Sequence, residues 1–156
     1  MAKIDSVPRR PVVLIILDGF GVNPGKLHNA VEQASTPKLD AFFASYPHTL
    51  IQASGPSVGL PDSQMGNSEV GHMILGAGAI IKQDIVNINE AIENGEFYDN
   101  LALIKAARKA KLSNRPLHLL GLVSDGGVHS DIKHLKALIR LAKQQGVKPV
   151  LHMIND

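Results

Sequence analysis

Residues 117–154 read LHLLGLVSDGGVHSDIKHLKALIRLAKQQGVKPVLHMI, and this stretch decides the fold. Leu117 to Val123 is a short apolar run, which is typical of a buried strand. The apolar positions between Ile132 and Ala142 recur at helical spacing, and Gly146 can end that helix. Val147 to Ile154 is a second apolar run. Strand, helix and strand in this order predict an α/β fold whose sheet is mainly parallel and flanked by helices.

A glycine-containing loop, Ser124 to His129, joins the first of these strands to the helix. We expect Ser130 to cap the helix, because a serine hydroxyl can accept a hydrogen bond from the first turn. His129 then follows the carboxyl end of a strand, where open α/β sheets bind ligands. It could donate a hydrogen bond to an anionic substrate or transfer a proton. The alternative is a surface histidine in a turn.

The N-terminal half of the sequence predicts two further strands. Val12 to Leu17 is a continuous apolar run that ends at Asp18-Gly19, as in a strand buried on both faces. Thr36-Pro37 is expected to start a short helix, and His48 to Ala53 is expected to be the second strand. The sheet would then have about four strands, at the low end for such a domain. Since the last strand reaches the end of the sequence, we expect an incomplete domain.

Ser68 and Asp18 are the candidate catalytic and metal-binding residues. A helix should begin near Asn67 or Ser68, and a serine at a helix start lies near unpaired N–H groups that favour a bound phosphate. Its hydroxyl is a weak nucleophile unless a base or a metal ion activates it. The Asp18 carboxylate could share a Mn²⁺, Mg²⁺ or Zn²⁺ ion with Ser68. Spacing alone also allows a structural role, in which Ser68 caps a helix and Asp18 forms a turn with Gly19.

The composition argues against several classes of function. The formal net charge is +2 and the sequence has no dense Lys/Arg run, so nucleic acid is not an expected partner. The absence of cysteine excludes a disulfide scaffold, a thiolate zinc site and a cysteine nucleophile, and it fits the cytoplasm. The apolar run at residues 12–17 is too short for a signal peptide or a membrane span, so we expect neither export nor membrane insertion.

Four segments of the sequence occur together, in the same order, in a known family. They are LDGFG at residues 17–21, GLPDSQMGNSEVGH at 59–72, LGAG at 75–78 and GGVHS at 126–130. These segments closely resemble motifs of cofactor-independent phosphoglycerate mutase, and the resemblance runs from about Pro11 to the last residue. A chance match to such an ordered set is very improbable. The resemblance therefore favours the functional interpretation of Asp18, Ser68 and His129.

The resemblance implies an isomerase of the alkaline phosphatase superfamily that interconverts 3-phosphoglycerate and 2-phosphoglycerate in glycolysis and gluconeogenesis. It implies two Mn²⁺ ions, with Mg²⁺ or another divalent ion as a possible substitute, and no 2,3-bisphosphoglycerate. By this resemblance, Ser68 takes the phosphoryl group from the substrate, Asp18 and Ser68 bind one metal ion, and His129 contacts the substrate. The complete enzyme is expected to be a cytoplasmic monomer whose partner is its small-molecule substrate.

Family enzymes are much longer than this chain, and a phosphotransferase domain interrupts their metal-binding phosphatase domain. By resemblance, residues 1–78 begin the phosphatase domain, residues 79–83 are a linker, and residues 84–156 begin the phosphotransferase domain. In this last part, apolar spacing predicts two amphipathic helices before the strand at Leu117. The other metal ligands would lie downstream, so this segment alone should be inactive. Two alternatives remain: another phosphomutase or phosphatase of the superfamily, and a noncatalytic fragment.

Overall fold

The computed structural model describes residues 11–62 and 64–155, which divide into two compact units. Unit 1 contains the described residues up to Ile51 together with Asn67–Glu69. Unit 2 contains the described residues of Gln52–Gly66 and those from Val70 onward. The domain boundaries predicted from the sequence, with a linker at residues 79–83, stay a prediction.

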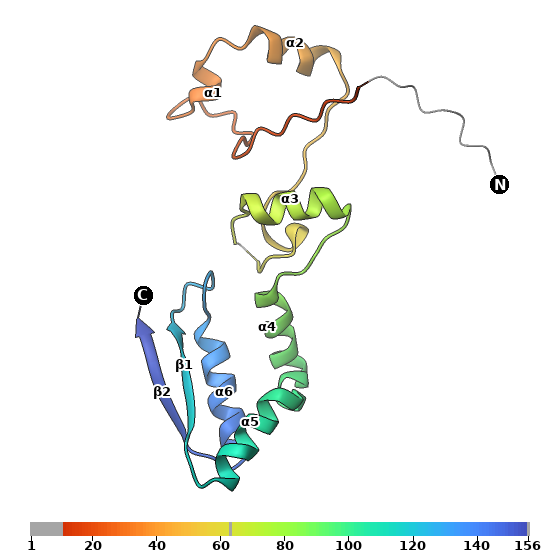
Figure 1. Ribbon diagram of the computed structural model, residues 1–156. Helices are drawn as coiled ribbons and strands as arrows, with labels where there is room; N and C mark the ends of the chain where they lie inside the picture. The colour runs from red at the N-terminus through yellow and green to blue at the C-terminus, as the bar shows by residue number, and fades with distance from the viewer. Residues whose placement is uncertain (1–10, 63, 156) are drawn as a thin grey trace, which may run out of the picture. The chain divides into compact units, whose positions relative to one another are not determined.

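Helices and two strands make up the regular structure of the described residues, and Figure 1 labels them in chain order. They are α1 (Ala30–Gln33), α2 (Pro37–Ser45), the 3₁₀ helix η1 (Gly55–Val58), α3 (Ser68–Ala77), α4 (Asp84–Asn94), the 3₁₀ helix η2 (Glu96–Asp99), α5 (Leu101–Leu112), β1 (Leu117–Val123), α6 (Ile132–Gln144) and β2 (Pro149–Asn155). Within the described ranges, no helix is long and apolar enough to cross a membrane.

The sheet of unit 2 consists of β1 and β2, which are parallel and connected through α6 (Figure 1). Leu117 is paired with Pro149, and Val123 is paired with Asn155. The carboxyl ends of the two strands therefore meet at one edge, where the Ser124–Ser130 loop begins. The α/β class and the parallel pairing predicted from the sequence are confirmed.

An apolar core packs α5 and α6 against the beginning of β1. Ala107 from α5, Leu141 and Ala142 from α6, and Val147 after α6 are all buried, and Leu117 packs against them. Leu141 is only 1% exposed. Removing such side chains from water contributes roughly 25 cal/mol for each Å² of apolar surface. This cluster therefore stabilises the strand, helix and strand that carry the His129 loop.

A second apolar cluster of unit 2 joins η1 to α3 through Val58, Leu60 and Val70. Two glycines permit the close backbone approaches beside this cluster. A Cβ atom at Gly59, whose φ is +71°, would lie 2.0 Å from the Ile81 carbonyl oxygen. One at Gly66 would lie 1.9 Å from the Ala53 carbonyl oxygen. Either substitution would force the backbone apart, so the segment that leads to α3 needs glycine at both positions.

The two strands predicted in the N-terminal half are absent from the described structure, so those predictions were wrong. Residues 12–17 and 48–53 form no ladder, and Val12 and Leu14 are 94% and 78% exposed. A strand requires hydrogen bonds from a neighbouring strand. Among the described residues, the sheet contains only β1 and β2. This sheet therefore has two strands, whereas the sequence predicted about four. An apolar run forms no strand unless a partner strand is present.

The helices predicted from the sequence are confirmed, with one difference in capping. α2 starts at Pro37 after its N-cap Thr36, and α3 starts at Ser68. For α6, however, the N-cap is Asp131 rather than the predicted Ser130. The Asp131 Oδ1 accepts a hydrogen bond of 2.8 Å from the Lys133 N–H. A carboxylate at this end also interacts favourably with the helix dipole, which explains the preference for the acidic residue.

Candidate active-site residues

Ser68 and Asp18 are 50 positions apart in the sequence and are directly hydrogen-bonded within unit 1. The Ser68 Oγ donates to the Asp18 Oδ2 at a distance of 2.6 Å. That distance lies at the short end for O–H···O bonds, as expected when the acceptor is a carboxylate. Both side chains are exposed. The polarised Ser68 hydroxyl is therefore accessible and is not buried in an apolar core.

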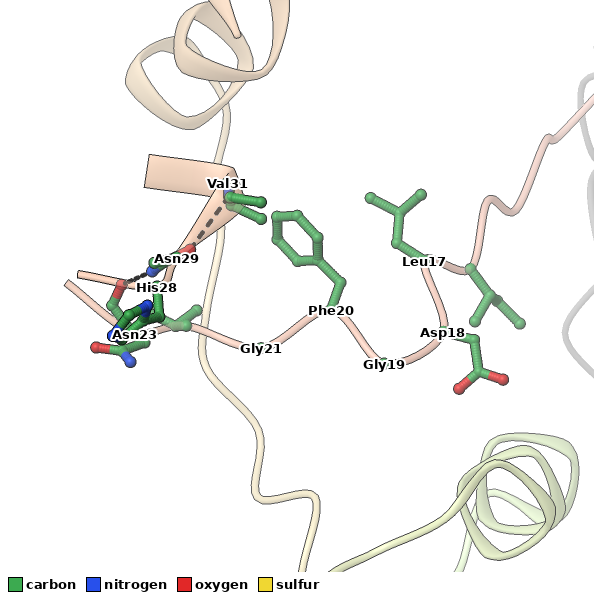
Figure 2. Close-up of a pocket in the computed structure, with 12 residues that line it drawn as sticks. Leu17, Asp18, Gly19, Phe20, Gly21, Asn23, His28, Asn29 and Val31 are labelled. Carbon is green, nitrogen blue, oxygen red and sulfur yellow. Dashed lines mark hydrogen bonds between the residues drawn. The ribbon is translucent and has the colours of Figure 1, made fainter. Parts of the chain in front are cut away.

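The Asp18 carboxylate projects from a tight turn of the LDGFG segment. The Phe20 N–H donates to the Leu17 carbonyl at 3.1 Å, and Gly19 has a φ of 76°. Glycine suits this left-handed position because it has no Cβ to clash. An open hollow lined by residues 16–23 and 28–31 lies beside the turn. Figure 2 shows the Asp18 carboxylate pointing away from the Phe20 ring, so its oxygens face away from the apolar part of the hollow.

Asn29 fixes the loop that follows this turn, and the sequence analysis did not identify it. Its Oδ1 accepts hydrogen bonds from the Val31 and Glu32 N–H groups, which caps α1. Its Nδ2 donates to the Asn23 carbonyl at 2.7 Å, as Figure 2 shows. Asparagine is a preferred N-cap, so Asn29 before a short helical segment was a usable signal. The helix is only four residues long, and its apolar periodicity is too short to detect.

Ser68 occupies the first position of α3, at the helix end where the backbone dipole places partial positive charge. Val70, two residues further on, is buried and fixes this end of the helix in its apolar cluster. Glu69 adds an acidic side chain to the first turn. The helix start therefore supplies fixed positive potential beside the Ser68 hydroxyl, a property that favours an anion.

His129 lies in unit 2, on the exposed loop between β1 and α6. The Gly127 N–H donates to the Ser130 carbonyl at 3.1 Å, and this bond closes a turn with Val128 and His129 at its tip. The Ser124 Oγ accepts a hydrogen bond of 3.1 Å from the Gly126 N–H. The structure therefore brings Asp18 and Ser68 together in unit 1 and presents His129 at the surface of unit 2. The functional roles of all three residues stay predictions.

Two other histidines, His118 and His152, lie in β1 and β2. Both are exposed, and the His118 Nδ1 lies 2.8 Å from the His152 Nε2. Their rings stack with centroids 5.1 Å apart. The core covers one side of the sheet, and among the described residues nothing is buried against the strand face that carries this pair. The histidines therefore contact each other rather than an apolar core.

The Asp18 and Ser68 side chains fit part of a site for a hard cation. They offer a carboxylate and a hydroxyl oxygen, which Mg²⁺ and Mn²⁺ prefer. In residues 11–62 and 64–155, no group of three or more His, Cys, Asp and Glu residues is arranged to hold a metal ion. Such cations usually take about six ligands. The pair can therefore contribute to a metal site, and most of the ligands must come from elsewhere.

Comparison with known proteins gives a consistent result over the whole chain. The family model described as the N-terminus of BPG-independent PGAM matches residues 88–156. The chain is 53% identical over 157 residues to the 2,3-bisphosphoglycerate-independent phosphoglycerate mutase of Coxiella burnetii (strain Dugway 5J108-111), covering 100% of this chain and 30% of the relative. It is 56% identical over 149 residues to the enzyme of that name from Clostridium perfringens (strain ATCC 13124), covering 95% and 29%.

A solved structure of Leishmania mexicana phosphoglycerate mutase at low cobalt concentration superimposes on the chain with a TM-score of 0.72. The sequence identity is 40%, and the match covers 97% of this chain and 28% of that one. The chain therefore shares its α/β fold with part of that phosphoglycerate mutase. More narrowly, its sequence is similar to the N-terminal portion of 2,3-bisphosphoglycerate-independent phosphoglycerate mutases. The chain spans about 30% of the length of the curated relatives.

Proposed function

We propose that this chain is part of an isomerase that interconverts 3-phosphoglycerate and 2-phosphoglycerate without 2,3-bisphosphoglycerate. In this proposal Ser68 is the nucleophile, Asp18 and Ser68 bind one of two Mn²⁺ ions, and His129 contacts the substrate. The complete enzyme is a cytoplasmic monomer that acts in glycolysis and gluconeogenesis. The other metal ligands and the remaining substrate-binding groups come from the part of the relatives that this chain does not span.

The 2.6 Å hydrogen bond from the Ser68 Oγ to the Asp18 Oδ2 is the observation that carries this proposal. It connects the LDGFG and MGNSEVGH segments, which are distant in the sequence. A serine that only capped α3 would have no need of a carboxylate from residue 18. An aspartate that only formed a turn with Gly19 would have no need of a hydroxyl from residue 68. The direct contact therefore supports a shared chemical role over two separate structural ones.

The proposed reaction is two transfers of one phosphoryl group. First, the Ser68 Oγ attacks the phosphorus, the bond from phosphorus to the glycerate oxygen breaks, and the serine proton moves toward Asp18. The departing glycerate oxygen takes up this proton from Asp18, which leaves phosphoserine and glycerate. In the second transfer, the other hydroxyl of glycerate gives its proton to Asp18 and attacks the phosphoserine, the bond from phosphorus to the Ser68 oxygen breaks, and that oxygen takes the proton back from Asp18. The sum is an isomerisation with no net change in protons or electrons.

Asp18 orients the hydroxyl for this attack, because the donated hydrogen bond turns the proton toward the carboxylate and away from the incoming phosphorus. The α3 N-terminus adds positive potential where charge accumulates on the phosphoryl oxygens. A divalent cation bound by the pair would supply further stabilisation of the serine alkoxide and of those oxygens. The exposed His129 imidazole can donate a hydrogen bond to an anionic group of the substrate.

A chimera tests the proposal, since the chain alone lacks most of the proposed site. This chain would replace the matching N-terminal segment of the Coxiella burnetii relative, to which it is 53% identical. We expect the chimera to convert 3-phosphoglycerate to 2-phosphoglycerate with Mn²⁺ and without added 2,3-bisphosphoglycerate, and the chain alone to be inactive. The measurement is an enolase-coupled assay, with the intact relative as the positive control and circular dichroism to confirm folding.

The possible outcomes separate the proposal from its competitors. A folded chimera without turnover, beside an active intact relative, would show that this chain does not supply a functional N-terminal portion. Release of inorganic phosphate without formation of 2-phosphoglycerate would indicate a phosphatase, in which water accepts the phosphoryl group. Turnover by the chain alone would show that the site does not require further ligands.

A further inference from the structure

Ser130 lies between two structural features, the turn that carries His129 and the start of α6. Its carbonyl accepts the 3.1 Å hydrogen bond from Gly127 that closes the turn. The next residue, Asp131, caps α6 by accepting a hydrogen bond from the Lys133 N–H at 2.8 Å. Any change in the backbone at Ser130 therefore affects the His129 turn and the helix cap together.

The Ser130 hydroxyl is the unusual group at this position. Its Oγ is buried and has no hydrogen-bond partner among the residues that the structure describes. A buried hydroxyl without a partner destabilises the conformation that contains it, and most buried polar groups in proteins are paired. Serine is also among the most favoured N-cap residues, together with aspartate. The sequence therefore places two good caps side by side, and the structure uses only Asp131.

A shift of the cap by one residue would give the Ser130 hydroxyl a partner. With Ser130 as the N-cap, its Oγ accepts from the Lys133 N–H, the same donor that Asp131 uses now. The Ser130 carbonyl then accepts the first α-helical hydrogen bond, from the His134 N–H, which now donates to the Asp131 carbonyl at 2.9 Å. Because the carbonyls of a helix point along its axis, accepting from His134 would turn the Ser130 carbonyl away from the Gly127 N–H. The cap shift and the opening of the His129 turn are thus one event.

We propose that Ser130 is a positioning residue for His129, and that its hydroxyl replaces Asp131 as the N-cap of α6 when an anionic substrate binds the loop. This inference rests on the proposed function, in which His129 contacts the substrate. In the described conformation, the Gly127 hydrogen bond fixes Val128 and His129 at the tip of a closed turn. In the shifted conformation that bond is released, and the imidazole can turn toward the phosphate or carboxylate of the ligand. The new Ser130 cap offsets part of the cost of opening the turn.

The first measurement needs no activity. Hydrogen exchange of the chimera is followed at the Gly127 and His134 amides, with and without 3-phosphoglycerate, and with inorganic phosphate as a second probe. Ligand should speed exchange at Gly127 and slow it at His134. Asp131→Ala removes the resting cap, so it should speed exchange at Gly127 without ligand. Equal exchange at Gly127 in all of these samples would overturn the cap shift, whether or not the chimera is active.

The second measurement separates positioning from stability. Ser130→Ala should lower kcat by about five- to tenfold, the effect expected from one lost cap hydrogen bond, with little change in KM. Its melting temperature should not fall, because the hydroxyl has no partner in the resting conformation. Ser130→Thr should restore most of the lost kcat, since it keeps a hydroxyl. The control is Ser113→Ala, which removes an exposed serine hydroxyl from the end of α5.

Each outcome decides the proposal. If Ser130→Ala kept the wild-type kcat, the Ser130 hydroxyl would either have no role or be hydrogen-bonded to water, and the proposal would be wrong. Loss of kcat together with a lower melting temperature, and without rescue by Ser130→Thr, would show a packing role instead. An inactive wild-type chimera would contradict the proposed function alone, and the hydrogen-exchange result at Gly127 would still test the cap shift.

Discussion

Unit 1 and unit 2 both contain short apolar runs, yet among the described residues only those of unit 2 form a sheet. Leu117–Val123 pairs with Pro149–Asn155 in unit 2, while the equally apolar residues 12–17 of unit 1 stay exposed. The helices of unit 1 before Ile51, α1 and α2, contain no buried residue, whereas both apolar clusters belong to unit 2. Apolar sequence is therefore not sufficient for a strand, and a partner must be within reach.

The partner of β1 is close in the sequence because α6 returns the chain directly to β2. A strand, helix and strand of this length supply each other's hydrogen-bonding partners, and α5, which directly precedes β1, completes the packing. The run at residues 12–17 has no such neighbour among the described residues. Local sequence therefore explains the sheet of unit 2, whereas we expect residues 12–17 to form a strand only where a distant partner is present.

The proposed catalytic residues are divided between these two regions. The Ser68–Asp18 pair lies in unit 1, which has little apolar packing, and His129 lies on the better packed unit 2. Substitution of Ser68 or Asp18 should therefore lower activity because it removes a reacting group. Substitutions near His129 should instead affect contacts with the substrate.

Ser68→Ala in the chimera should reduce turnover to below about 1% of the unmodified chimera, since removing a nucleophile usually costs several orders of magnitude. No group of unit 2 can replace the Ser68 Oγ as the attacking oxygen. The measurement is the coupled assay at saturating 3-phosphoglycerate, with mass spectrometry for a phosphorylated serine peptide. Phosphate on residue 68 should disappear with the activity. Residual turnover above that level would assign the nucleophile to another residue.

Asp18→Asn should weaken Mn²⁺ binding by at least about ten- to a hundredfold, a range already reached when residues that only support metal ligands are changed. The amide keeps the size of the side chain but loses the negative charge that a hard cation prefers. Activity of the chimera should then require more Mn²⁺. Titration of activity against Mn²⁺ measures the shift. An unchanged titration curve would return Asp18 to a purely structural turn with Gly19.

His129→Gln should lower kcat/KM by about ten- to a hundredfold, the effect of losing a hydrogen bond to a charged group. Bound Mn²⁺ should stay the same, because His129 is proposed to contact substrate rather than metal. Metal analysis of the purified variant beside its kinetics distinguishes the two roles. A drop in metal content would contradict the proposed division between the two units.

The sequence analysis predicted unit 2 well for a physical reason. The apolar spacing of α6 and the continuous run of β1 reflect contacts made within the same stretch, so local sequence carries the necessary information. The cap of α6 was wrong by one residue because Ser130 and Asp131 are both good caps. The local sequence does not distinguish between them, and in the structure it is Asp131 that accepts from the Lys133 N–H.

The same reasoning failed for the strands of unit 1, because pairing depends on groups far away in the sequence. Residues 12–17 satisfy every local criterion for a strand and still lack a neighbour among the described residues. Asp18 and Ser68 were identified by chemistry and by family resemblance rather than by spacing. Their hydrogen bond spans 50 residues, and no sequence periodicity reports a contact of that kind.

Leu141→Ala tests the local stability of unit 2. Leu141 is almost fully buried among Ala107, Ala142 and Val147. Truncating a buried leucine typically costs about 2.7 to 5 kcal/mol, because apolar contacts are lost and a cavity remains. The free energy of unfolding of the chain should fall by that amount in urea titration followed by circular dichroism. A loss below about 1 kcal/mol would show that this cluster does not stabilise the fold.

Leu14→Ala should have the smallest effect on the stability of the chain alone. It also tests most directly the difference between unit 1 and unit 2. Leu14 is 78% exposed, so its truncation should change the free energy of unfolding by less than about 0.5 kcal/mol. In the chimera, a neighbouring strand from the longer relative would bury the run at residues 12–17. The same substitution should then cost about 2 to 5 kcal/mol, as in a core. Parallel urea titrations of both proteins give the two values. If Leu14→Ala changed the free energy of unfolding by the same small amount in both proteins, residues 12–17 would stay exposed even with the rest of the enzyme present. Residues 12–17 would then not depend on distant partners.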